Sequence, residues 1–377
     1  MSFLVQAPRL SAADAGRLAR QLYGLDAIAA PLPSERDQNF LLRATGDSGT
    51  GGLGTHDRGQ NTVRYVLKIA NATEDRAMLE AQNAAMAHVA DPPTRLRRFG
   101  GTGRVALCPH ALPTRSGDLI GVVPGGAHFV RLVTYVEGVP LAEVRERPPA
   151  LFESLGRAVG RLDRALEDFD HPAIHRDFHW DLARAGAVIQ EHLPRVTDHA
   201  DRQMVERITR AALPAIERHQ PAFRRSAVHH DANDWNVLVS TPDGGRIPSS
   251  GGSDTVSDPR RPESRTPTPE VVGIIDFGDM VHSWTVADPA VAVAYAMLDA
   301  ADPLATAEAV IHGYQFEHPL HQEERAAVFL LACLRLCMSA CIAAWQQAQR
   351  AGDEYLAVSQ QPIRRTLPAL ATILERR

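Results

Sequence analysis

Two short motifs in the second half of the chain carry side chains that could bind a metal ion and accept a proton. In the first, HHDANDWNVLV at residues 229–239, Asp231 stands five positions before Asn236. In the second, GIIDFGDM at residues 273–280, Asp276 opens a D-F-G sequence. A transferring phosphoryl group spreads negative charge over its oxygens, so its site needs oxygen ligands for Mg²⁺ and a base for the attacking hydroxyl. We therefore expect Asp231 to be the catalytic base and Asn236 and Asp276 to bind the metal.

Another histidine motif, HRDFHWD at residues 175–181, has the first letters of a kinase catalytic loop. Its spacing does not fit, because the residue five positions after Asp177 is Leu182, which cannot bind a metal ion. No strand followed by D-F-G comes directly after it. We interpret this segment as a link between helices that faces the cleft, where Trp180 and Asp181 either recognise substrate or have a structural role.

A lone lysine, Lys68, lies within the apolar run YVLKIAN, which predicts a buried strand. Burying an ammonium group costs free energy unless an anion pairs with it. A kinase-type site supplies such anions in the nucleotide phosphates and in a carboxylate of the following helix. We expect Glu80, in the middle of that helix, to be the partner, with Glu74 as the alternative. A surface lysine on an edge strand is the competing structural interpretation.

The turn in PSERDQNF, residues 33–40, precedes this strand's neighbour and is expected to cover the phosphates. Ser34 and the backbone N–H groups around Gln38 and Asn39 would be the donors. The turn lacks the glycines of a protein-kinase phosphate loop.

The elements that must position these residues form two groups, as a chain of 377 residues suggests. Residues 1–133 have the pattern of a capped helix, a small and mostly antiparallel sheet, and one main helix. Residues 134–140 would connect the lobes, with the backbone near Tyr135 and Val136 against the edge of an adenine or guanine. Residues 141–377 have mainly helical periodicity. We therefore expect an α+β protein with a small nucleotide-binding lobe and a larger catalytic and substrate-binding lobe.

Two stretches rich in glycine, serine and other polar residues interrupt this pattern, at 46–61 and 241–270. Such compositions bury little surface. We expect the first to be a flexible hairpin loop and the second a flexible insertion between two hairpin strands, NVLVS and VVGIIDF. Their roles are left open.

The composition is that of a globular protein, with 44% hydrophobic and 23% charged residues. The net charge of -5 argues against a nucleic-acid partner. We find no apolar run as long as a membrane span and no signal-peptide pattern, so we expect a cytoplasmic protein with no membrane partner.

Three of the four cysteines recur every four residues in an apolar helical segment, at Cys333, Cys337 and Cys341. Residues at that spacing follow one another along a helix and do not converge on one metal ion. We expect all four, Cys108 included, to be buried free thiols.

Together, these motifs resemble the aminoglycoside phosphotransferase and choline kinase family of small-molecule kinases, and within it the hydroxylysine kinase branch. The segments that carry the resemblance follow the family order from residue 22 to residue 280: LYGL, PLPSERDQNF, YVLKIAN, VRLVTYVEG, HRDFHWDL, HHDANDWNVLV and GIIDFGDM. The resemblance implies a protein-kinase-like two-lobed fold, Mg²⁺, and phosphoryl transfer to an alcohol. The hydroxylysine kinase branch implies GTP as donor and a hydroxylated amino acid as acceptor.

The family's roles fall on Lys68 for the phosphates, Asp231 for the base, and Asn236 and Asp276 for the metal. His230 stands where the family commonly has glycine.

Several functions are open at this point. A small-molecule kinase could act on hydroxylysine, homoserine, choline or an aminoglycoside, with ATP or GTP as donor. A nucleotide-binding module that has lost catalysis is the alternative from another class. A protein kinase is disfavoured, because apolar helices follow DFGDM with no activation segment or A-P-E sequence. The oligomeric state is left open.

Overall fold

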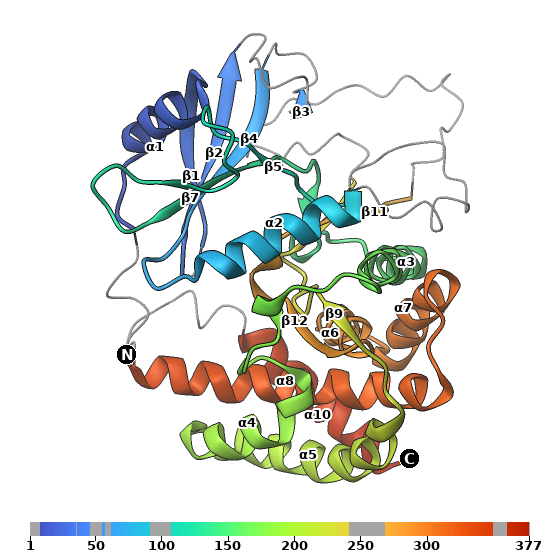
Figure 1. The fold of residues 1–377 in the computed structure, drawn as a ribbon. Helices are drawn as coiled ribbons and strands as arrows, with labels where there is room; N and C mark the ends of the chain where they lie inside the picture. Colours follow the sequence, from blue (N-terminus) through green and yellow to red (C-terminus); the bar gives the residue numbers. More distant parts are fainter. Residues whose placement is uncertain are drawn as a thin grey trace, which may run out of the picture.

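The chain folds into a β-sheet with one long helix and a larger, mainly helical part beneath it (Figure 1). The predicted α+β class, with a small antiparallel sheet followed by helices, is confirmed. Both predicted insertions lie largely outside the described residues. The computed structural model describes residues 8–34, 36–45, 55–56, 62–90, 107–240, 268–349 and 360–376.

The first sheet is antiparallel and has the strand order β1-β2-β4-β7-β5, with β3 beside β4 and β6 beside β7. In β4 (Thr62–Ile69), every second residue from Val63 onward is buried, so Lys68 lies on the opposite face. The predicted pairing of this strand with β2 is confirmed. The other strands of the sheet are β1 (Ala27–Leu32), β2 (Gln38–Thr45), β3 (Thr55–His56), β5 (Ala111–Leu112), β6 (Gly121–Val122) and β7 (Phe129–Thr134).

The predicted capped N-terminal helix is confirmed. Helix α1 (Ala12–Leu18) begins with a capping box in which Ser11 and Asp14 exchange hydrogen bonds with each other's backbone N–H groups. It continues as one π-helical turn, η2 (Ala19–Tyr23), and ends at Gly24, whose φ of 71° suits glycine. The main helix of this lobe is α2 (Arg76–Ala90), also as predicted.

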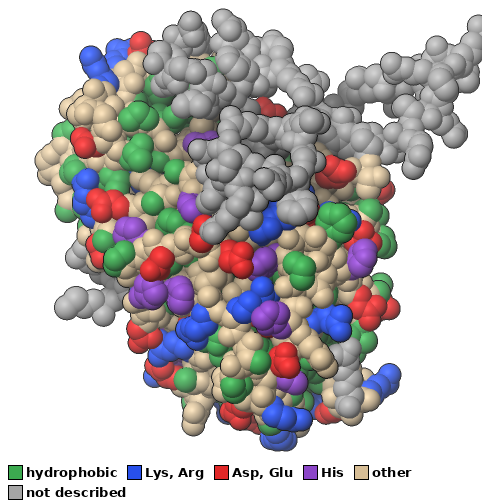
Figure 2. All heavy atoms as spheres, turned by 45° about the vertical axis from the view of Figure 1, so that its right-hand side comes forward, with side chains coloured by type: hydrophobic (Ala, Val, Ile, Leu, Met, Phe, Trp, Pro, Cys, Tyr) green, Lys and Arg blue, Asp and Glu red, His purple; other side chains and the backbone are tan. Residues whose placement is uncertain are grey.

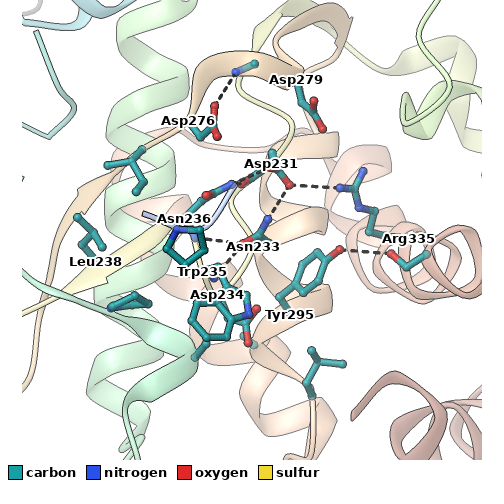
Figure 3. Close-up of a pocket in the computed structure, with 18 of the residues that line it drawn as sticks. Asp231, Asn233, Asp234, Trp235, Asn236, Leu238, Asp276, Asp279, Tyr295 and Arg335 are labelled. Atoms are coloured by element: carbon teal, nitrogen blue, oxygen red, sulfur yellow. Dashed lines mark hydrogen bonds and ion pairs between the residues drawn. The ribbon is translucent and has the colours of Figure 1, made fainter. Parts of the chain in front are cut away.

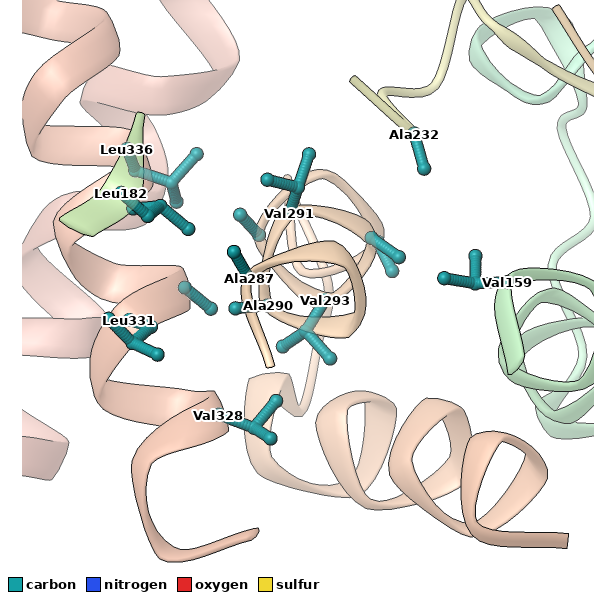
Figure 4. Packing of buried hydrophobic residues seen from close by; sticks show 14 of the residues in the cluster. Val159, Leu182, Ala232, Ala287, Ala290, Val291, Val293, Val328, Leu331 and Leu336 are labelled. Atoms are coloured by element: carbon teal, nitrogen blue, oxygen red, sulfur yellow. The ribbon is translucent and has the colours of Figure 1, made fainter. Parts of the chain in front are cut away.

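Helix α6 (Ala287–Ala296) forms the centre of the helical part, with every residue except Tyr295 buried. Figure 4 shows it between Val159 of α3 on one side and Leu331 and Leu336 of α8 on the other. The other helices are α3 (Pro149–Leu166), α4 (Ala185–His192), α5 (His199–His219), α7 (Pro303–Glu317), α8 (Gln322–Gln349) and α10 (Gln360–Glu375). Short 3₁₀ helices are η3 (Leu141–Glu143), η4 (Pro172–Ile174), η5 (Leu182–Arg184), η6 (Leu193–Arg195), η7 (Gln220–Ala222) and η8 (Phe277–Asp279).

Helices α3 and α7 approach each other closely because both carry glycine at the contact. A Cβ atom at Gly156 would lie 1.9 Å from the carbonyl oxygen of Val310, and one at Gly313 would lie 2.0 Å from that of Glu153. No side chain fits at such distances, so these glycines set the separation of the two helices.

Helix α8 is long and apolar enough to cross a membrane, by length and composition. The prediction that no apolar run is as long as a membrane span is therefore wrong. The most apolar window of α8 is 83% buried inside the protein, however, so the composition is explained by packing. The cysteines at 333, 337 and 341 are fully buried free thiols, and Cys108 is buried as well, as predicted.

Two small antiparallel sheets in the helical part position the polar motifs. In one, β10 (Val237–Val239) pairs with β11 (Val271–Ile274), the predicted hairpin, and with β8 (Val139–Pro140). In the other, β9 (Arg225–Val228) pairs with β12 (Val281–Trp284), which the sequence did not predict. Asp231 and Asn236 lie between β9 and β10, and Asp276 lies between β11 and β12. Because β9 pairs with β12 and β10 with β11, both polar segments are fixed side by side.

Both signs of charge are present on the surface. On the face shown in Figure 2, lysine and arginine side chains are interspersed with acidic side chains and several histidines. This part of the surface has no uniform potential that would attract a polyanion.

Candidate active site

A cavity of about 1780 Å³ lies between the sheet and the helical part. Lys68 lines it from β4, Tyr135 and Val136 from the connector, and Asp231 and Asp276 from the two polar motifs. The structure therefore brings together side chains that are far apart in the sequence, in a space large enough for a nucleotide and a small acceptor.

Asp231 is at the centre of the site (Figure 3). Its Oδ2 accepts a hydrogen bond from Asn236 Nδ2 at 2.6 Å. Its Oδ1 accepts from Asn233 Nδ2 at 2.9 Å and from Arg335 Nη2 at 3.4 Å. Burial raises the pKa of the Asp231 carboxyl well above its usual range, Asp279 raises it further, and Arg335 opposes the increase. A positioned carboxylate with a raised pKa has the properties that a general base needs.

Lys68 pairs with the D-F-G aspartate. Its Nζ lies 3.1 Å from Asp276 Oδ1, and the lysine side chain is only 15% exposed. The positive charge of Lys68 is the main cause of the lowered pKa of Asp276, which therefore stays ionised. The prediction that Lys68 pairs with Glu80 is wrong in this structure, because Glu80 bonds to Arg76 at 2.9 Å on the outer side of α2.

The alternative glutamate, Glu74, lines the cavity as Lys68 does. Burial raises the pKa of Glu74, and the nearby Asp37 raises it further. The inner face of α2 carries amides in place of acids: Gln82 accepts from Arg131 Nη2 at 2.7 Å and Asn83 from Arg131 Nη1 at 3.1 Å.

Only part of the turn that is predicted to cover the phosphates lines the cavity. Ser34 and Asn39 line the cavity, and Asn39 Oδ1 is buried with no partner among the described residues. Gln38 is turned away, because its side chain makes two hydrogen bonds with the backbone of Leu10, at 2.8 and 2.7 Å. Arg36 of the same turn pairs with Asp279 at 3.2 Å.

The two residues predicted to recognise substrate have different positions. Trp180 lines the cavity. Asp181 is 7% exposed, and its Oδ1 accepts from Ser283 Oγ at 2.5 Å and from Ala183 N at 3.0 Å as the cap of η5. Since this carboxylate is used inside the fold, the substrate-binding role predicted for Asp181 is wrong, and its role is structural.

Sequence reasoning missed three residues of the site. Asp279 follows the D-F-G sequence and lines the cavity. Arg335 is a lone charge in an apolar helix, the same signal that identified Lys68. Asp288 lies behind the first motif, and its carboxylate accepts the backbone N–H groups of His229 at 2.8 Å and His230 at 2.5 Å.

The oxygen atoms present fit a divalent cation that is also held by substrate phosphates. Asp276 has an ionised carboxylate, and Asn236 uses its Nδ2 for both bonds to Asp231, so its Oδ1 is the atom that could bind a cation. Among the described residues, no three His, Cys, Asp or Glu side chains converge on one point. Mg²⁺ is usually bound by one or two carboxylates together with phosphates and water, and Asp276 supplies one such carboxylate.

Two lobes around a cleft, with a lysine on a strand and Asp, Asn and D-F-G side chains opposite it, define the class of kinase-type phosphotransferases. The model of the phosphotransferase enzyme family matches residues 53–248, just over half of the chain, and the chain belongs to this family. It is a phosphotransferase that acts on a hydroxyl group of a small molecule.

The comparisons with individual proteins agree. Hydroxylysine kinase of Mus musculus is 29% identical over 367 residues, covering 93% of this chain and 87% of the relative. The Danio rerio hydroxylysine kinase is 27% identical over 382 residues, covering 96% and 91%. Among solved structures, a microcompartment-associated aminopropanol kinase has a TM-score of 0.61 at 16% identity, covering 97% of each chain. A spectinomycin phosphotransferase in complex with ADP has a TM-score of 0.57 at 11% identity, covering 98% of this chain and 100% of the other. These structures confirm the fold that the sequence resemblance implies.

Proposed function

We propose that this protein transfers the γ-phosphoryl group of GTP or ATP to the side-chain hydroxyl of an amino acid, with hydroxylysine as the favoured acceptor. The observation that carries the proposal is the arrangement of Asp231 and Asn236 opposite the Lys68–Asp276 pair in one cavity. The similarity to hydroxylysine kinases over most of the chain supports the choice of acceptor.

In the proposed reaction, Asp231 orients the acceptor hydroxyl and takes its proton. The hydroxyl oxygen forms a bond to the γ-phosphorus as the bond to the leaving nucleoside diphosphate breaks. When the nucleotide binds, the ammonium group of Lys68 leaves Asp276 and pairs with the phosphates. Mg²⁺ held by Asp276 and Asn236 would neutralise charge on the phosphate oxygens. Trp180 excludes water from the acceptor side.

A transfer assay with ATP and GTP against hydroxylysine, homoserine, choline, aminopropanol and an aminoglycoside tests the proposal. We expect phosphorylated hydroxylysine to form with the highest kcat/KM of the panel. A higher value for another acceptor would contradict the favoured acceptor, and nucleotide binding with no product from any acceptor would favour the catalytically inactive module.

A further inference from the structure

Arg335 forms part of the cavity wall beside the candidate base. It comes from the middle of α8 and its side chain is 2% exposed. Its Nη1 donates to the backbone carbonyl of Trp180 at 3.2 Å. The guanidinium carbon lies 4.5 Å from the ring centroid of Trp180 and 5.9 Å from that of Tyr295. A permanent cation is therefore fixed between two aromatic rings at the edge of the acceptor space.

The hydrogen-bonding capacity of this guanidinium is only partly used. A guanidinium has five N–H donors, and those of Arg335 make hydrogen bonds to three residues, Trp180, Asp231 and Tyr295. Its Nε is buried and has no acceptor among the described residues. The contact to Asp231 is long, at 3.4 Å, and that carboxylate also accepts from two asparagines. Buried cations are normally well paired, so this site has the chemistry to take another anion.

The geometry indicates which anion. The Oδ2 of Asp231 is on the side of Asn236, where the metal and phosphates are expected, and Oδ1 is on the side of Arg335. Figure 3 shows Asp276 and Arg335 on opposite sides of Asp231. An anion at Arg335 would therefore belong to the acceptor and not to the nucleotide.

We propose that Arg335 binds the carboxylate of the acceptor and so selects hydroxylated amino acids over amino alcohols that lack a carboxylate. This inference rests on the proposed phosphotransfer to an amino acid and adds the residue that determines specificity. An arginine can bind a carboxylate through two N–H groups at once, which fixes the distance between the carboxylate and the hydroxyl presented to Asp231.

The wild-type protein tests the substrate half of the inference with acceptor pairs that differ in the carboxylate. Hydroxylysine is compared with its carboxamide, and homoserine with 3-amino-1-propanol. We expect kcat/KM to be about 10- to 100-fold higher for the carboxylate-bearing member, the range for a hydrogen bond to a charged group. Equal values for both members of each pair would overturn the inference.

Variants test the role of the residue. Arg335→Gln should remove the preference for the carboxylate, mainly by raising KM for hydroxylysine, and Arg335→Lys should keep part of it. The control is Arg184→Gln, since Arg184 also lines the cavity but already pairs with Asp177, and the substrate ratio should not change. If Arg335→Gln lowers kcat equally for both members of a pair and leaves the ratio unchanged, the residue only positions Asp231 and the inference is wrong.

The two proposals can fail separately. If hydroxylysine is not phosphorylated but homoserine is preferred over 3-amino-1-propanol, the favoured acceptor is wrong and the carboxylate inference stands. If hydroxylysine and its amide are phosphorylated equally well, the proposed function stands and the inference fails. Should Arg335→Gln not fold, the wild-type substrate pairs still decide the inference.

Discussion

Asp288 fixes the backbone of His230: its Oδ1 accepts the His230 N–H at 2.5 Å, and its Oδ2 accepts the N–H of His229 at 2.8 Å. The two histidines directly precede Asp231, and Asp288 is fully buried near the start of α6. The loop that carries the candidate base is thus attached to the centre of the core by one carboxylate.

Replacing Asp288 should therefore reduce both stability and turnover. Asp288→Ala leaves two buried N–H groups without their acceptor, which costs about 2–5 kcal/mol of the free energy of unfolding. We expect kcat to fall more than tenfold, since the loop loses its position, with little change in nucleotide affinity. Urea unfolding and steady-state kinetics measure the two effects. The control is Asp198→Ala, which removes an exposed cap of α5 and should cost about 1 kcal/mol without changing kcat.

The left-handed backbone of His230 should make glycine more favourable than alanine at this position. Its φ is 67°, which is costly for residues with a Cβ atom. Both substitutions remove the imidazole, so we expect His230→Gly to be more stable than His230→Ala by about 1 kcal/mol. His229, whose φ is not positive, is the control, and there alanine should be the more stable substitution. If the relative stability of the glycine and alanine variants were the same at both positions, the backbone of His230 would not be strained.

The close contact of α3 and α7 should not tolerate a methyl group. Gly313→Ala places a Cβ 2.0 Å from the carbonyl oxygen of Glu153, so the helices must separate and we expect a loss of more than about 3 kcal/mol. At Gly186 in α4 the added Cβ would meet only the end of the Leu213 side chain, at 3.3 Å, and Gly186→Ala should change stability by less than about 1 kcal/mol. Thermal unfolding compares the two variants.

The buried acid Asp163 should make stability depend on pH. Burial raises the pKa of its carboxyl well above the usual range, and the charge of Asp288 raises it further. As the pH rises above about 4, the unfolded state loses this proton while the folded state keeps it, so stability falls until the folded pKa is reached. Asp163→Asn removes this loss and can still accept the hydrogen bond from Tyr314. The advantage of the variant in Tm should therefore grow as the pH rises above about 4, and parallel curves would contradict the raised pKa.

The residues that sequence reasoning found share a local signal. Lys68 was found because a lone charge in an apolar strand needs a partner, and Asp231, Asn236 and Asp276 because their spacing matches a known requirement of phosphoryl transfer. Arg335 is likewise a lone charge, in an apolar helix, so the need for a partner that identified Lys68 also predicts a role for Arg335.

Other features depend on contacts that no local pattern contains. Asp288 is more than 50 residues from the loop it holds, and its helix is apolar on all sides, so its orientation cannot be read from periodicity. The pairing of Glu80 with Lys68 was mispredicted because neighbouring residues of a helix point in different directions. A position in the middle of α2 therefore does not by itself indicate that the side chain faces the strand. Strand β1 was missed because AIAAPL has low strand propensity, and an edge strand tolerates its proline.

The most direct test of the account is single-turnover phosphoryl transfer to hydroxylysine by the wild type and by Asp231→Asn. The amide keeps the size of the side chain and hydrogen bonds with Asn233 or Asn236 but cannot accept the proton. We predict that the rate of the chemical step falls at least about 100-fold, the lower range for a general base, while the Kd for nucleotide stays within about threefold. An unchanged rate in Asp231→Asn would contradict the assignment of Asp231 as the base and, with it, the mechanism built around this cavity.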